Sequence, residues 1–356
     1  METTSVIKKF ADLKIFSDAK KHILFVGETG SGKTTFQLEL LFYYWYKGHI
    51  ILHRDDEGLE FQHLLAYGVP MNIFIPKGCN LRFKEGVYDY NIYHFDWQEP
   101  SSIFQVMEKS RKRFNVVVFD IFVKDITQAI WLEPEFYFRL LGDFSKYASR
   151  RMDTRRIILS IDELDDIIPP KGWGSSETHE KLIPIFEKML RKLRKKNVTI
   201  IASTHRPNQL SKSARKTFQY KIVKFSDPED ARNFLDPLLI MAKTSLWKKI
   251  INDVQKMKEN ECYIFDRRGF YNKHTLPDLP SRPRIIEAIE GEVKVPTRER
   301  GYDEIDLIIA IMRAKKASFP QIAKKVHMAQ SSVYERYKKL MKRPVIEEVL
   351  TIDSFD

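Results

Sequence analysis

Residues 27–34 read GETGSGKT, which is the pattern Gly-x-x-x-x-Gly-Lys-Thr. An apolar run at 22–26 (HILFV) comes directly before this stretch, and a helix-length segment at 34–46 follows it. Glycines in such a turn let several backbone N–H groups point toward one anion, and the start of the following helix adds its positive dipole end. The stretch therefore predicts a phosphate-binding loop between a strand and a helix.

The parts of this loop have separate predicted roles toward ATP and Mg²⁺. Lys33 is expected to reach the β- and γ-phosphates, and the hydroxyl of Thr34 to ligate Mg²⁺. The residues predicted to bind the nucleotide are Gly27, Glu28, Thr29, Gly30, Ser31, Gly32, Lys33, Thr34 and Thr35. The alternative is a glycine-rich turn without a ligand, but the order of strand, loop and helix favours the nucleotide.

A magnesium site also needs a carboxylate at the end of a neighbouring strand, and two apolar runs offer one. Residues 157–161 (IILSI) lead into Asp162 and Glu163, whereas residues 116–119 (VVVF) lead into Asp120 alone. Asp162 is expected to hold Mg²⁺, usually through water, and Glu163 to activate the attacking water as general base. The second acid favours this pair, and Asp120 remains the alternative.

A further apolar run at 198–202 (VTIIA) leads into a polar segment that contains Thr204 and His205. A polar side chain at the end of a strand next to the phosphate site can contact the γ-phosphate or position a water. His205 or Thr204 is predicted to do this. The alternative is a loop histidine with ordinary hydrogen-bond partners.

Short apolar runs alternate with helix-length segments through the first three-quarters of the chain. The runs lie at 22–26, 49–52, 116–119, 157–161 and 198–202. They are rich in β-branched residues, as expected of strands buried on both faces of a parallel sheet. Helix-length segments such as 34–46 and 180–196 lie between several of them. The pattern predicts a doubly wound α/β domain with a mainly parallel sheet.

Composition changes near residue 276, where three prolines occur within 276–283. Such proline density is typical of a linker. We therefore expect a lead-in at 1–20, an NTPase domain at 21–275, a Pro-rich linker at 276–300, a helical DNA-binding domain at 301–345 and a tail at 346–356.

The C-terminal unit has the spacing of a helix-turn-helix. Ser318 is a plausible N-cap with Pro320 in the first turn, and a short turn at 327–329 leads into a second helix at 330–340. In DNA-binding proteins of this kind the second helix enters the major groove. The residues predicted to contact DNA are Gln330, Ser331, Ser332, Tyr334, Arg336, Lys338 and Lys339. Residues 345–352 could add a β-wing, and a protein-docking unit is the alternative.

The charge balance fits a polyanionic partner. The formal net charge is +12, and the two cysteines have no metal-like spacing, so they are expected to be ordinary thiols. The first twenty residues hold no apolar run long enough for a signal peptide. The most apolar stretch, 36–52, is interrupted by Glu39 and Lys47 and falls short of the roughly 20 apolar residues of a membrane helix. A soluble cytoplasmic protein without a membrane anchor is expected.

The order of these motifs resembles the HerA/FtsK superfamily of ring-forming DNA pumps. The segments that carry the resemblance are 27–34, 55–60 (DDEGLE), 157–163, 204–207 (THRP), 221–230 and 261–265, within roughly 20–272. His205 stands where the family usually has glutamine. The resemblance implies a RecA-like P-loop ATPase core, a homo-oligomeric ring, commonly of six subunits, and a C-terminal winged helix that orients the motor on DNA.

In this family an arginine from a neighbouring subunit completes each site. Arg206 matches the family's motif position and is therefore a candidate catalytic residue. The other candidates form a basic run, Arg150, Arg151, Arg155 and Arg156, although such a run is more often a solvated face.

Three functions remain open. The favoured one is an ATP-driven double-stranded DNA translocase, because the motifs and the C-terminal unit both point to nucleic acid. Such pumps serve packaging, processing or transfer, with a capsid, nuclease or transfer partner. The second is an ATP-switched DNA-binding regulator or replication initiator of AAA+ type. The third is a protein-remodelling NTPase whose basic tail docks on an acidic partner.

Overall fold

We describe the protein from a computed structural model. The structure describes residues 19–55, 58–124, 126–151, 155–167, 192–205, 212–226, 244–266, 271–275, 283–293 and 317–341, with short pieces at 7–8, 10–11, 16, 184, 186–189, 210, 308–309 and 312–313.

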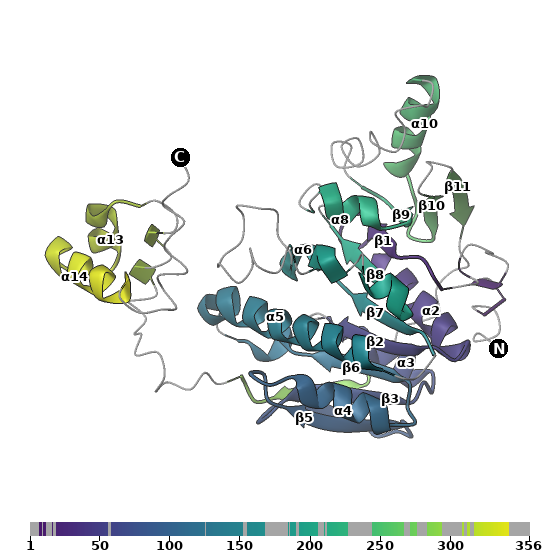
Figure 1. Cartoon of the computed structure of the whole chain (residues 1–356). Helices are drawn as coiled ribbons and strands as arrows, with labels where there is room; N and C mark the ends of the chain where they lie inside the picture. Colours follow the sequence, from purple (N-terminus) through teal and green to yellow (C-terminus); the bar gives the residue numbers. More distant parts are fainter. Residues whose placement is uncertain are drawn as a thin grey trace.

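A ten-stranded sheet forms the centre of the molecule (Figure 1), in the order β11-β10-β9-β1-β8-β7-β2-β6-β3-β5. Its strands are β1 (Ile23–Val26), β2 (Ile50–Asp55), β3 (Met71–Pro76), β5 (Tyr90–Phe95), β6 (Phe114–Val118), β7 (Ile157–Ile161), β8 (Val198–Thr204), β9 (Tyr220–Val223), β10 (Glu261–Phe265) and β11 (Tyr271–Thr275). All neighbours from β9 to β5 pair in parallel, and only β10 and β11 are antiparallel. The predicted mainly parallel α/β sheet is confirmed, and its five predicted strands are β1, β2, β6, β7 and β8.

Helices connect these strands. They are α2 (Lys33–Tyr46), α3 (Gln62–Ala66), α4 (Ser101–Lys109), α5 (Ile126–Arg150), α6 (Leu164–Ile167), α8 (Lys212–Thr217) and α10 (Thr244–Val254), with short 3₁₀ turns η2 (Asp120–Phe122) and η3 (Arg194–Lys196). Helix α2 is the one predicted after the glycine-rich loop. Of the helix predicted at 180–196, the structure describes residues 184, 186–189 and 192–193 as helical and 194–196 as η3, and the rest of that segment lies outside the described residues.

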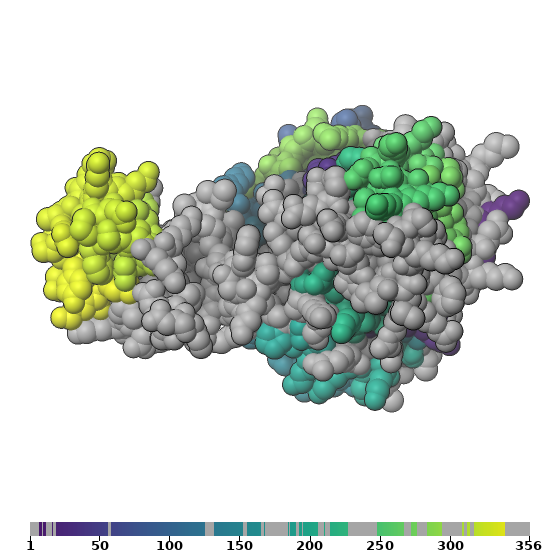
Figure 2. Space-filling model, turned by 90° about the horizontal axis from the view of Figure 1, so that it is seen from above, coloured from purple at the N-terminus to yellow at the C-terminus, as the bar shows by residue number. Residues whose placement is uncertain are grey.

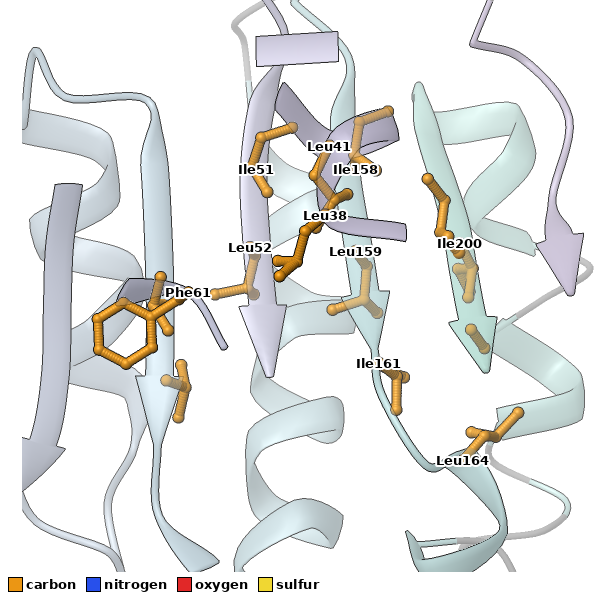
Figure 3. Packing of buried hydrophobic residues seen from close by; sticks show 14 of the residues in the cluster. Leu38, Leu41, Ile51, Leu52, Phe61, Ile158, Leu159, Ile161, Leu164 and Ile200 are labelled. Atoms are coloured by element: carbon orange, nitrogen blue, oxygen red, sulfur yellow. The ribbon is translucent and has the colours of Figure 1, made fainter. Parts of the chain in front are cut away.

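Apolar contacts between α2 and the central strands form much of the core. Every residue of β1, β2, β6, β7 and β8 is buried, as a sheet covered by helices on both faces requires. Figure 3 shows Leu38 and Leu41 of α2 beside Leu52 of β2 and Ile158 and Leu159 of β7. Removing water from one such side chain stabilises the fold by about 1.5–3 kcal/mol, so this packing holds α2 firmly on β2 and β7.

Part of the predicted linker is folded onto the α/β domain. Strand β12 (Ile286–Glu290) pairs antiparallel with β4 (Asn80–Phe83), and Gln62 Oε1 accepts hydrogen bonds from the N–H groups of Ile285, at 2.8 Å, and Ile286, at 3.1 Å. Ile285 is buried against the main core. The prediction of a linker throughout 276–300 is therefore wrong for these residues, because apolar side chains after the prolines find a partner strand.

Two C-terminal helices, α13 (Phe319–Lys325) and α14 (Gln330–Met341), lie where the sequence predicts helices. They have a small core of their own, in which Ile309, Ile322 and Val333 are fully buried. Ser318 caps α13 in a capping box with Gln321. Figure 2 shows both helices, in yellow, as a compact unit at the molecular surface. The expected wing at 345–352 and most of 302–312 lie outside the described residues, and the identification as a DNA-binding helix-turn-helix stays a prediction.

Within the described parts of the chain, every helix is too short or too polar to cross a membrane.

Candidate active site

The glycine-rich loop turns sharply between β1 and α2. The N–H of Glu28 donates to the carbonyl of Phe225 at 2.8 Å, and Gly32 begins α2 with a left-handed φ of 79°. A methyl group on Gly32 would lie 2.7 Å from Cγ of Glu259, and one on Gly27 would lie 2.8 Å from the Phe225 carbonyl oxygen. Glycine is thus required at both positions, by close approach and, at Gly32, also by backbone conformation.

The start of α2 is suited to an anion. Gly32 offers no side-chain cap, and the first turn of α2 holds no acidic residue, so the positive end of the helix dipole faces the loop, with the Glu259 side chain packed beside Gly32. Ser31 Oγ and Thr35 Oγ1 are buried and, among the described residues, have no hydrogen-bond partner. Buried hydroxyls are normally paired, so these two atoms fit a polar ligand at the loop.

A chain of polar contacts joins the loop to the acidic pair. The ammonium of Lys33 donates to the carbonyl of Glu28 at 2.9 Å and lies 2.9 Å from Nδ1 of His205, which follows β8. His205 Nε2 contacts Oε1 of Glu163, at the end of β7. A lysine ammonium can only donate, so Nδ1 accepts from it, and Nε2 carries the proton that it donates to the Glu163 carboxylate. The predicted residues Lys33, Glu163 and His205 therefore lie together.

The acidic pair sits on a constrained turn. Asp162 is 1% exposed, while Glu163 is half-buried and has a left-handed φ of 48°. A residue with a Cβ pays about 1–2 kcal/mol for this conformation, which persists only when its surroundings fix it. The N–H of Glu163 donates to Ser203 Oγ at 2.9 Å, and the same hydroxyl donates to Oδ1 of Asp162. Ser203 of β8 thus holds both residues.

Behind this turn lies a buried network that the sequence did not reveal. Arg54, on β2, donates to the main-chain carbonyl of Asp162 and pairs with the carboxylate of Asp120. Its Nε donates to the hydroxyl of Tyr137, on α5, at 3.0 Å, and that hydroxyl donates to Asp120 at 2.6 Å. Burial raises the pKa of Tyr137 well above its usual value, so the phenol stays protonated. The sequence signal for this network was Arg54, a charged residue near the end of the apolar strand β2, just before Asp55.

The strand order separates the two acidic candidates. Only β8 lies between β7, which carries Asp162 and Glu163, and β1, which carries the loop, whereas β8, β7 and β2 lie between β1 and β6, which carries Asp120. Asp120 is engaged by Arg54 and Tyr137 instead. The topology therefore supports Asp162 and Glu163 over Asp120 as the acids of this site.

A second buried carboxylate lies next to this turn, on β2. Arg54 pairs with Ile161 in the β2–β7 register, so Asp55 follows it beside Asp162. Asp55 Oδ1 accepts from the N–H of Phe61 and lies 3.2 Å from Nε2 of His53. Burial raises the pKa of Asp55, and the neighbouring charge of Asp162 acts in the same direction. Two buried carboxyl groups, Asp55 and Asp162, therefore lie close together at the carboxyl ends of β2 and β7.

Of the other predicted residues that the structure describes, Thr204 lies next to the loop and Arg156 lies away from the acidic pair. Arg206 lies outside the described residues. Arg156, in the basic run, stands just before β7, at the opposite end of that strand from Glu163, and its guanidinium bonds to Asn197 at 3.1 Å. Thr204 is buried at the end of β8, beside Val26.

The predicted DNA contacts lie on α14. Gln330, Ser331, Ser332, Tyr334 and Lys338 are exposed, Arg336 is half-buried, and the side chain of Lys339 is outside the described set. Among the described residues, no three His, Cys, Asp or Glu side chains gather as a metal site. The predicted magnesium ligands, Thr34 and Asp162, are a hydroxyl and a single carboxylate, so the remaining ligands would come from nucleotide and water.

The chain is similar to known proteins in part of its sequence and in its fold. The model of the ATPase family associated with various cellular activities (AAA) matches residues 105–225, about a third of the chain (121 of 356 residues). That match contains β7 and β8 but begins after the glycine-rich loop. No curated protein matches the sequence.

Three solved structures illustrate the structural likeness. The genome packaging NTPase B204 from Sulfolobus turreted icosahedral virus 2 shares 14% identity over 73% of this chain and 98% of its own, with a TM-score of 0.45. VirB4 of Thermoanaerobacter pseudethanolicus shares 11% over 73% and 90%, with a TM-score of 0.49. The bacterial conjugative coupling protein TrwB shares 14% over 76% and 89%, with a TM-score of 0.50.

At such low identity the likeness to TrwB speaks for the fold alone. It agrees with the mainly parallel α/β sheet. The match to the AAA family adds the ATPase class. The chain therefore has the α/β fold of a P-loop NTPase, shared with TrwB, and over residues 105–225 it is similar to the AAA ATPases.

Proposed function

We propose that this ATPase is a motor that uses Mg²⁺ and ATP to move double-stranded DNA. The observation that carries the proposal is the contact chain from Lys33 through His205 to Glu163, in a fold shared with a conjugative coupling protein. This chain of contacts gives the proposed phosphate ligand and the proposed general base a common partner, which supports ATP hydrolysis at this site, and the fold shared with the coupling protein supports DNA as the partner of the motor.

In this proposal the loop holds the nucleotide and the end of β7 carries the chemistry. Lys33 contacts the β- and γ-phosphates, Thr34 and Asp162 hold Mg²⁺, and Glu163 activates the attacking water. Mg²⁺ would neutralise charge on the phosphate oxygens. The unpaired hydroxyls of Ser31 and Thr35 and the uncapped start of α2 support binding of a phosphate group here.

The C-terminal unit is proposed to bind DNA. The side chains at the start of α14 are exposed, while Val333 anchors the helix in the small core, so one face of α14 is available to a partner. Lys324 and Lys325 of α13 are also exposed and can meet phosphates. The net charge of +12 favours the same class of partner.

We further propose that the motor works as a ring, commonly of six subunits, in which an arginine of the neighbouring subunit completes each site. Arg206 is the candidate for that role by its motif position. Negative-stain images with an ATP analogue and duplex DNA would test the ring directly. Discrete monomers on DNA would contradict it.

The central test is DNA-stimulated turnover. ATP hydrolysis is measured with no DNA, with long duplex DNA of unrelated sequences and with short duplexes, and displacement of a streptavidin roadblock from biotinylated DNA is followed in parallel. A motor should turn over several-fold faster on any long duplex and clear the roadblock. Unchanged turnover together with an undisturbed roadblock would contradict the proposal. Glu163→Gln is the control, because it should bind ATP yet clear nothing.

The match to the AAA family favours a second candidate, an ATP-switched DNA-binding regulator or initiator. Such a protein would bind one DNA sequence tightly and hydrolyse ATP slowly. Competition between specific and random duplexes, at a stated salt concentration, separates the two functions.

A further inference from the structure

We propose that Arg54, Tyr137, Asp120 and Ser203 form a positioning cluster, which orients Glu163 by fixing the peptide unit between Asp162 and Glu163. The inference deepens the proposed function, since it takes Glu163 as the general base. None of the four side chains needs to touch the nucleotide to have this effect.

The peptide unit between the two acids is held at both ends. Its carbonyl oxygen, on Asp162, accepts from the guanidinium of Arg54. Its N–H, on Glu163, donates to Ser203 Oγ at 2.9 Å. Side chains from the two strands that flank β7, β2 and β8, therefore fix the plane of one peptide unit.

These hydrogen bonds to the peptide unit explain the backbone conformation of Glu163. A left-handed φ of 48° is rare for a residue with a side chain and needs surrounding contacts that leave no easier alternative. The turn directs the Glu163 carboxylate to His205, while the Asp162 carboxylate accepts a hydrogen bond from the Ser203 hydroxyl. If the peptide unit rotated, the Glu163 carboxylate would leave the direction of the loop.

The guanidinium of Arg54 is itself fixed. It meets three partners in three directions, the Asp162 carbonyl, the Asp120 carboxylate and the Tyr137 hydroxyl. Only the planar fork of arginine can satisfy all three, so lysine is a poor substitute. Because Tyr137 also donates to Asp120, loss of its hydroxyl loosens the guanidinium without removing a charge.

The cluster should affect turnover and not nucleotide affinity. The contacts of the cluster reach the 162–163 turn, whereas the loop residues that would hold the phosphates have other partners, such as Phe225. A general base that is displaced by about 1 Å can cost up to about 100-fold in rate, whereas ground-state binding is unchanged.

The experiment compares Tyr137→Phe, Ser203→Ala and Arg54→Lys with the wild-type chain. Steady-state kcat and KM, the Kd of a fluorescent ATP analogue and the melting temperature are measured for each. We expect kcat to fall about tenfold for Tyr137→Phe and further for Arg54→Lys, with Kd changed by less than about twofold. If Arg54→Lys does not fold, the two milder variants still decide the matter.

Tyr263→Phe is the matched control. The Tyr263 hydroxyl also donates to a carboxylate, Asp253, at 2.7 Å, but β10 is separated from β7 by β9, β1 and β8. A merely structural effect of losing a tyrosine–carboxylate bond would appear equally in both variants. Equal kcat values for Tyr137→Phe and Tyr263→Phe would overturn the inference.

A double-mutant cycle shows whether the cluster acts through Glu163. In the Glu163→Gln background, Tyr137→Phe should change the residual rate by less than about twofold. A tenfold loss there would overturn the inference, as would unchanged kcat for Tyr137→Phe and Ser203→Ala beside an inactive Glu163→Gln. A normal rate for Glu163→Gln would overturn the proposed base together with the inference, so the two failures are distinguishable.

Discussion

His205 Nδ1 lies 2.9 Å from the Lys33 ammonium, so one imidazole joins the phosphate loop to the strand that carries the acids. The opposite ring nitrogen contacts Glu163. A phosphate bound at the loop would compete with His205 for the Lys33 ammonium. Loss of the Lys33–His205 hydrogen bond would in turn change the hydrogen bond between His205 and Glu163. The proposed base is thus connected to phosphate binding by two hydrogen bonds.

This relationship predicts different outcomes for two substitutions of His205. Glutamine can accept from Lys33 and donate to Glu163, so His205→Gln should keep kcat within a few-fold of wild type. His205→Ala removes both contacts and should lower kcat by about tenfold to a hundredfold. Steady-state ATP hydrolysis at saturating ATP checks this, and an unchanged rate for His205→Ala would rule out a connecting role.

Substitutions of Lys33 in the loop and of Glu163 after β7 distinguish ATP binding from ATP hydrolysis. Lys33→Ala removes the ammonium that meets the phosphates and should abolish turnover. Glu163→Gln should bind ATP normally and lower kcat by about 100-fold or more, because the amide cannot take the proton of water. Equilibrium binding of a fluorescent ATP analogue, measured beside hydrolysis, distinguishes the variants. Normal turnover by Glu163→Gln would mean that another group is the base.

Gly32 should tolerate no side chain. In Gly32→Ala the methyl group would meet Cγ of Glu259 at 2.7 Å with φ at 79°, so we expect a loss of about 1–3 kcal/mol of unfolding free energy and weakened ATP binding. Gly142→Ala is the matched control, since a methyl group there has no neighbour within 4 Å in the interior of α5. It should stabilise the chain by up to about 1 kcal/mol. Thermal or urea unfolding of both variants tests the contrast.

The free energy of unfolding should decrease as the pH rises, because Asp55 loses its proton in the folded chain. Burial raises the folded-state pKa of Asp55 above the unfolded value of about 3.9, so the folded chain holds a proton that the unfolded chain has released. This contribution is complete below the unfolded pKa and is lost as pH rises through the folded pKa.

The matching substitution is Asp55→Asn, which cannot ionise and keeps an oxygen that can accept from the N–H of Phe61. Its melting temperature should exceed that of the wild-type chain near neutral pH, and the difference should shrink toward pH about 4. A difference that stays constant over this range would show that Asp55 titrates normally.

The central strands and the loop could be predicted because their physics is local. A run such as 157–161 is apolar at every position, since both faces of β7 are covered. Strand β5 was not predicted, because it lies at one edge of the sheet and mixes polar and aromatic residues. Strand β12 was hidden by the prolines before it, and its partner β4 is about 200 residues away in the sequence.

The residues of the site also divide into those that local sequence predicts and those that it does not. Lys33, Asp162 and Glu163 were predicted because each directly follows an apolar strand or a glycine-rich turn. Arg54 and Tyr137 were not, because their importance depends on a contact between residues 83 positions apart. Long-range hydrogen bonds of this kind leave no periodic or local signal in a sequence.

The pairing of β12 with β4 has a mechanical consequence for the proposed motor. The chain that leads to α13 and α14 departs from a short ladder on β4, and the N–H of Val293 is also bonded to the Phe122 carbonyl at 2.9 Å. Among the described contacts, a load on the C-terminal unit would therefore reach the Val293–Phe122 hydrogen bond first and the β12–β4 ladder next. The force at which the β12–β4 hydrogen bonds break therefore limits the force that can pass between the α/β domain and the C-terminal helices α13 and α14.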